Sequence, residues 1–138
     1  MIPVDVNYIA VIAAAVANMV VGALWYSSFM FGSYWIKLMG FTDKKTEEMK
    51  KAANKAYAFS GIAALVMSYV LAVFLRLADV SMLTEGLYVG FIVWLGFVAT
   101  ITLQSVVFEG RSKELFVLNN GYNLVGILVM AAVLTTWA

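Results

Sequence analysis

Neutral polar side chains inside long apolar stretches are the residues with which this sequence could do chemistry. They are Asn18, Thr100, Gln104, Asn119 and Asn123. Thr100 and Gln104 are four residues apart, a spacing that places two side chains on one face of a helix. Asn119 and Asn123 have the same spacing, and the two pairs fall at similar depths in their stretches. We therefore expect the five side chains to form one polar cavity.

Such a cavity would bind or conduct rather than catalyse. Amides and hydroxyls bind ions, neutral polar molecules or lipid headgroups, but they do not exchange protons at neutral pH. A small polar solute, an ion or a lipid headgroup is therefore the expected ligand. The other interpretation is that these groups only join neighbouring helices by hydrogen bonds inside the membrane.

Metal-dependent and acid–base chemistry is disfavoured, because the residue types that perform it are missing. The chain has no histidine and no cysteine, which are the usual ligands of zinc and iron and frequent catalytic bases and nucleophiles. The eight methionines are expected to fill apolar space. A lipid-modifying enzyme would depend on Glu109, Glu114 or Asp43 alone. We expect no cofactor, no metal and no enzymatic activity.

The composition indicates an integral membrane protein of one domain over residues 1–138. Hydrophobic residues make up 64% of the chain and charged residues 12%, with a mean hydropathy of +0.92. Soluble domains carry about 25% charged residues. A bilayer core of about 30 Å is crossed by about 20 helical residues. Four stretches meet this length, at residues 7–27, 58–78, 84–107 and 115–137, and predict an all-α, four-helix transmembrane bundle.

The cations are segregated and predict the orientation of the bundle. Arg76 is the single cation in the loops on one side, where Asp5 and Glu85 also lie. The cations of the other side are Lys37, Lys44, Lys45, Lys50, Lys51, Lys55, Arg111 and Lys113. Because loops rich in lysine and arginine stay in the cytoplasm, we expect both termini outside.

Four of these lysines form a cluster that could bind a partner. Anionic lipid headgroups or a partner protein would contact Lys44, Lys45, Lys50 and Lys51. The alternative is that they only set the topology. Nucleic acid is disfavoured as a partner, because acidic residues interrupt the cluster.

Aromatic residues mark the inner membrane surface. Trp25 and Tyr26 end the first stretch, and Trp35 follows in the segment before Lys37, as expected of an interfacial aromatic belt and a short interfacial amphipathic segment. Thr42 can cap a helix that continues without a breaker to Leu77, which would extend the second span into the cytoplasm.

Small residues at helical spacing predict close helix packing. Gly22 ends a stripe of small residues in the first stretch, and Gly86 and Gly90 form a GxxxG pattern at the start of the third. They serve either packing within one chain or the contact face of a homo-oligomer such as a dimer. The second interpretation makes the protein a structural or accessory subunit that acts by self-association or by binding a partner protein.

Three stretches resemble a known family, the small four-span membrane proteins called domain of unknown function 1761. They are VGALWYSSFMFGSYWIKLMGFT, WLGFVATITLQSVVFEGR and LFVLNNGYNLVGILVMAAVLTTW. The resemblance implies a four-helix fold in a prokaryotic cell membrane, without an established activity. It draws attention to Trp25, Tyr26, Asn119, Gly121 and Tyr122. Ser28 stands where the pattern favours proline and Asn123 where a histidine is frequent.

Overall fold

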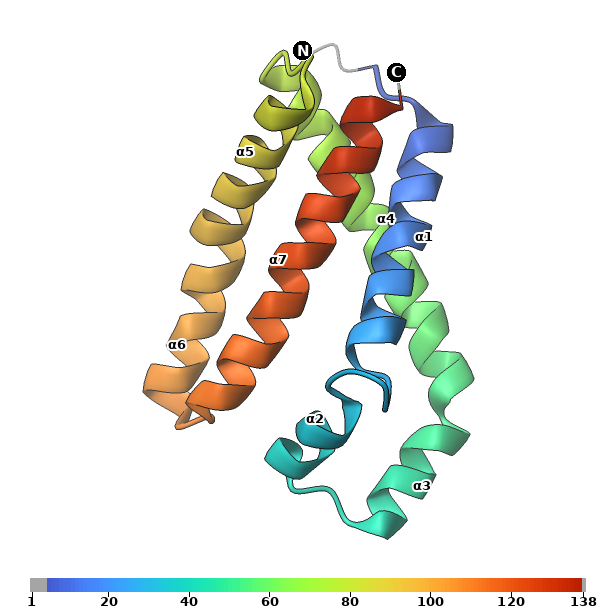
Figure 1. Cartoon of the computed structure of the whole chain (residues 1–138), viewed down its shortest axis with the longest axis vertical. Helices are drawn as coiled ribbons and strands as arrows, with labels where there is room; N and C mark the ends of the chain where they lie inside the picture. Colours follow the sequence, from blue (N-terminus) through green and yellow to red (C-terminus); the bar gives the residue numbers. More distant parts are fainter. Residues whose placement is uncertain (1–4, 138) are drawn as a thin grey trace.

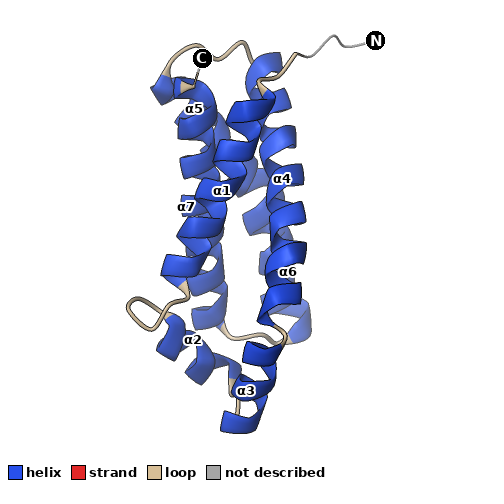
Figure 2. Cartoon of the chain, turned by 90° about the vertical axis from the view of Figure 1, so that its right-hand side faces the viewer, coloured by secondary structure: helices blue, strands red, loops and turns tan. Residues whose placement is uncertain are grey.

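The computed structural model of the chain describes residues 5–137 and shows, over that range, helices joined by short loops (Figures 1 and 2). The helices are α1 (Tyr8–Trp25), α2 (Gly32–Met39), α3 (Asp43–Lys51), α4 (Ala53–Leu77), α5 (Leu83–Val93), the π-helix η1 (Trp94–Ala99), α6 (Thr100–Glu109) and α7 (Lys113–Thr136). Because α5, η1 and α6 follow one another without a break, they form one rod, Leu83–Glu109. This rod, α1, α4 and α7 are each long and apolar enough to cross a membrane, which confirms the predicted all-α, four-span class.

The arrangement of the four rods places α7 at the centre. It packs along α1 on one side and α5 on the other, and α1 packs along α4, as Figure 1 shows. The chain begins and ends at one end of the bundle, here called the termini end, together with the α4–α5 loop (Figure 1). The opposite end, here called the lysine end, carries α2, α3 and the α6–α7 loop (Figures 1 and 2).

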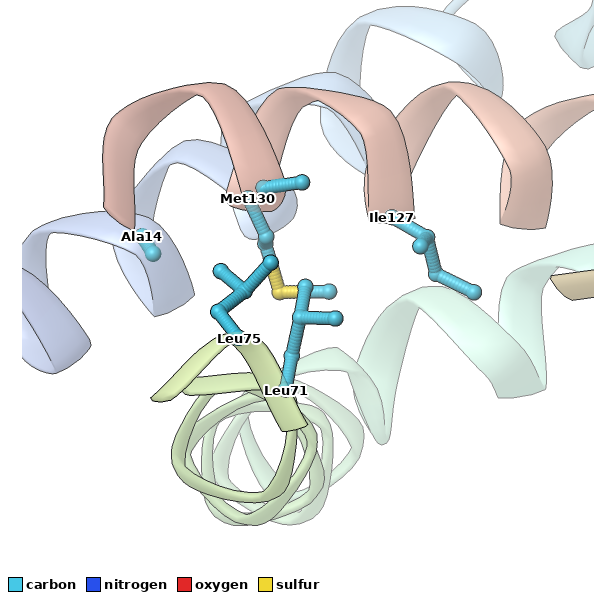
Figure 3. Close-up of a cluster of buried hydrophobic side chains, with 6 residues drawn as sticks. Ala14, Leu71, Leu75, Ile127 and Met130 are labelled. Atoms are coloured by element: carbon cyan, nitrogen blue, oxygen red, sulfur yellow. The ribbon is translucent and has the colours of Figure 1, made fainter. Parts of the chain in front are cut away.

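The apolar core lies between α1, α4 and α7. Its buried side chains are Ala14, Leu71, Leu75, Ile127, Met130 and Ala131, and Figure 3 labels all of them except Ala131. Met130 is fully buried beside the small Ala14. In a membrane such contacts stabilise by close packing, since lipid tails are as apolar as the core itself.

The lysine end departs from the expected continuous helix. The chain turns at Ala52, whose N–H donates to the carbonyls of both Glu48 and Met49 at 3.2 Å, and α3 and α4 run in different directions (Figure 1). No residue of α3 is buried, so no tertiary packing holds it in line with α4. The amphipathic segment predicted before it forms the short helix α2.

The π-helix η1 is the feature of the third rod that the sequence does not predict. A π-helical turn contains an extra residue, so it rotates everything beyond it relative to the residues before it. Gln104 follows Gly86 by about five turns of 3.6 residues. In a regular α-helix, Gln104 would therefore lie on the same face as Gly86. Two threonine hydroxyls of α6 donate to backbone carbonyls of η1. Thr100 Oγ1 donates to Gly96 O and Thr102 Oγ1 to Val98 O, both at 2.7 Å.

Candidate functional site

Two hydrogen bonds join α1 to α7 at the lysine end. Trp25 Nε1 donates to the Leu118 carbonyl at 3.1 Å, and the Tyr26 hydroxyl donates to Asn119 Oδ1 at 2.6 Å. Tyr26 is the C-cap of α1 and directly follows Trp25, the last residue of the helix. Asn119 is therefore held as part of a helix–helix contact.

Aromatic rings surround these bonds. The Tyr26 ring packs edge-on against Tyr122 and Trp35, with centroid distances of 5.4 and 5.6 Å. Trp25 packs against Phe31 at 4.8 Å. Together these contacts attach α2 to the ends of α1 and α7. The structure thus brings together the four aromatics singled out in the sequence, Trp25, Tyr26, Trp35 and Tyr122.

Glycines make room for these side chains. A Cβ atom on Gly121 would lie 3.0 Å from Trp25 Cζ2, and one on Gly22 would lie 3.0 Å from the Tyr122 hydroxyl. In the third rod, a Cβ on Gly90 would be 3.2 Å from the Ala131 Cβ, and Gly86 lies against Thr135. Gly22, Gly86, Gly90 and Gly121 therefore all serve packing against other helices of the same chain.

The asparagines near the middle of the bundle are packed or paired. Asn18 is only 6% exposed; its Oδ1 lies against Gly126, and its side chain approaches the Tyr122 hydroxyl. Asn120 is 4% exposed and donates from Nδ2 to the Phe116 carbonyl at 3.0 Å. Its Oδ1 is 3.0 Å from the Thr102 hydroxyl.

The structure does not bring the five predicted cavity residues together. Thr100 and Gln104 are exposed, because η1 turns them away from α7 and places Thr102 there instead. Asn119 and Asn123 are half-buried on α7, and Asn18 packs on α1. Asn120 and Thr102, which do meet between α7 and α6, are not among the residues predicted from the sequence. The seven-residue spacing of Asn120 and the core residue Ile127 could have indicated that Asn120 faces inward.

A cavity of about 360 Å³ lies at the other end of the bundle, at the termini end, between α1, α4 and α7. Its polar lining includes Asp5, Asn7, Arg76, Thr135 and Trp137. Its apolar lining is Val6, Ala10, Ala72, Leu75, Val80 and Leu134. Because these residues come from distant parts of the chain, no local sequence pattern groups them.

Arg76 and Asp5 are linked within this cavity. Arg76 Nε donates to the Asp5 backbone carbonyl at 2.8 Å, which leaves the two terminal amino groups of the guanidinium and the Asp5 carboxylate outside that bond. Over residues 5–137 the ion pairs are Lys50–Glu47 and Arg111–Glu109, and neither cavity charge takes part in one. The Thr135 hydroxyl is buried without a hydrogen-bond partner in the described chain. The cavity therefore combines a cation, a carboxylate and an apolar wall.

Comparison with known proteins identifies a family. The family described as "protein of unknown function (DUF1761)" matches residues 9–135, which include every membrane-crossing rod almost entirely. No curated protein and no solved structure matches the chain. The matched range carries the Trp25–Tyr26 contact with α7 as well as most of the lining of the termini-end cavity. The chain belongs to this family of proteins of unknown function.

Proposed function

We propose that this protein binds the ionic headgroup of a membrane lipid, or of another small amphiphile, in the termini-end cavity. The observation that carries the proposal is the cavity of about 360 Å³ with Arg76 in its lining. That volume lies within the range of about 300–1,000 Å³ of small-molecule sites. It corresponds to about twelve water molecules at about 30 Å³ each, which is enough for a headgroup.

Arg76 supplies the main attraction for an acidic headgroup. A guanidinium presents its donors in a fixed planar fork that matches the oxygens of a phosphate or carboxylate. The bond from Nε to the Asp5 carbonyl fixes the plane of the fork. The apolar wall formed by Ala10, Leu75 and Leu134 can accept the first part of a hydrocarbon chain.

The distribution of cations supports a site on the outer membrane surface. Eight cations lie in the loops and helices of the lysine end, from Lys37 to Lys55 and at Arg111 and Lys113. Positively charged loops stay in the cytoplasm. The termini end, and with it the cavity, therefore faces the exterior and meets lipids of the outer leaflet of a prokaryotic cytoplasmic membrane.

Replacing Arg76 tests this function. We expect Arg76→Gln to reduce the lipid that remains bound after purification in mild detergent, measured by native mass spectrometry, by roughly 10- to 100-fold. The reason is that a hydrogen bond to a charged group contributes about 1.5–3 kcal/mol. Arg111→Gln is the matched control, because Arg111 is exposed and paired with Glu109 at 2.9 Å at the lysine end. Equal lipid retention by the Arg76 variant and wild type would refute the function.

A second function, association with another copy of the chain, is favoured by Gln104. Its amide is exposed on a membrane-crossing rod, where an amide gains from pairing with the same residue across a two-fold axis. Two such hydrogen bonds would contribute about 0.6 kcal/mol each. We therefore expect Gln104→Leu to raise the dissociation constant of the dimer about eightfold. Concentration-dependent energy transfer in vesicles measures this change. Asn54→Leu, which removes an exposed amide from α4, is the control. An unchanged monomer–dimer equilibrium in the Gln104 variant would exclude this contact.

A further inference from the structure

The termini-end cavity carries two opposite charges, and we propose that its ligand is zwitterionic, with a phosphate on Arg76 and a primary ammonium on Asp5. Phosphoethanolamine has this chemistry. The inference rests on the proposed function and adds to it the class of headgroup. Both Arg76 and Asp5 line the same cavity of about 360 Å³.

The geometry keeps the two charges close together without neutralising them. The 2.8 Å bond from Arg76 Nε goes to the backbone carbonyl of Asp5, and no ion pair within residues 5–137 includes the Asp5 carboxylate. The neighbouring Asn7 does not compete for a ligand, because its Oδ1 accepts from the N–H groups of Ile9 and Ala10 at the start of α1. A ligand that brings one charge of each sign would satisfy both Arg76 and Asp5.

Other headgroups fit this pair of charges less well. An anionic phosphoglycerol headgroup would place its phosphate on Arg76, but it offers no cation to Asp5, and the nearby carboxylate would repel it. A phosphocholine headgroup carries both charges, but its quaternary ammonium has no N–H to donate. A primary ammonium donates up to three hydrogen bonds, which are stronger when the acceptor is a carboxylate.

The test titrates the detergent-purified protein with phosphatidylethanolamine, phosphatidylglycerol and phosphatidylcholine of identical acyl chains, with binding followed by native mass spectrometry. We expect the ethanolamine lipid to bind roughly tenfold more tightly than the other two. Asp5→Asn should remove this preference while binding of the glycerol lipid stays equal or rises. Asp79→Asn is the matched control, since Asp79 lies in the α4–α5 loop at the same end but outside the cavity lining.

The outcomes separate this inference from the function on which it rests. If phosphatidylglycerol binds wild type as tightly as phosphatidylethanolamine, or if Asp5→Asn keeps the preference, the zwitterionic ligand is wrong and headgroup binding stands. If neither the three lipids nor glycerophosphoethanolamine binds, both are wrong. Glycerophosphoethanolamine, which lacks acyl chains, identifies the source of the ligand. If glycerophosphoethanolamine displaces phosphatidylethanolamine with the same affinity as the lipid itself, the ligand is a soluble zwitterion. If it displaces the lipid only weakly, the ligand is the lipid.

Discussion

Gly126→Ala is expected to lower the free energy of unfolding by about 2 kcal/mol, within the range of about 1–3 kcal/mol for overpacked interiors. A Cβ at this position would occupy the space of Asn18 Oδ1 and would lie 3.4 Å from Asn18 Cγ. Gly126 is buried and Asn18 is 6% exposed, so the amide has no free space into which to move. Unfolding in detergent, followed by circular dichroism, measures the effect.

A second substitution separates this clash from a general loss of helix packing. Asn18→Ala removes the amide, so the double variant Asn18→Ala/Gly126→Ala should recover most of the stability that Gly126→Ala loses. Gly96→Ala is the matched control, because a Cβ at Gly96 meets no atom within 4 Å and alanine is the better helix former. Equal destabilisation by Gly126→Ala and Gly96→Ala, or a double variant less stable than Gly126→Ala alone, would show that Asn18 and Gly126 do not pack as described.

The four spans could be predicted because bilayer thickness fixes the length of an apolar helix. The sequence therefore identifies all four rods, and the largest difference is at α4, which begins at Ala53, five residues before the predicted start at residue 58. Trp25, Tyr26 and Tyr122 could be placed at one end of the bundle for a similar reason, since aromatic rings favour the interface. Their contact with Asn119 and Trp35 depends on tertiary structure that a single sequence does not specify.

The face of the third rod could not be predicted, because a π-helical turn has no clear sequence signal. Counting 3.6 residues per turn from Gly86 leads to Gln104, whereas the structure turns Gln104 outward and places Thr102 beside Asn120. One extra residue in η1 is sufficient to cause this error. The predicted cavity at Asn18, Thr100, Gln104, Asn119 and Asn123 rested on the four-residue spacings and on similar depths, which do not specify the face that Thr100 and Gln104 present to α7.

The termini-end cavity could not be predicted, because its lining joins the start of α1, the end of α4 and the end of α7. In the sequence, Arg76 indicates only the end of a span and Asp5 only a polar residue before the first span. The bond between Arg76 and the Asp5 carbonyl spans 71 residues. Similarly, a helix-forming sequence does not reveal that the chain turns at Ala52 and that no residue of α3 is buried.

Cysteine labelling tests most directly whether the termini-end cavity faces the exterior. The chain contains no cysteine, so a single introduced thiol reports one position. Ser81 and Ser28 are both exposed, Ser81 in the α4–α5 loop at the termini end and Ser28 between α1 and α2 at the lysine end. With a membrane-impermeant maleimide on intact cells, we expect complete labelling of Ser81→Cys and almost none of Ser28→Cys until the membrane is permeabilised. Labelling of Ser28→Cys alone, or of both variants equally, would contradict a four-span bundle with its headgroup cavity on the outer surface.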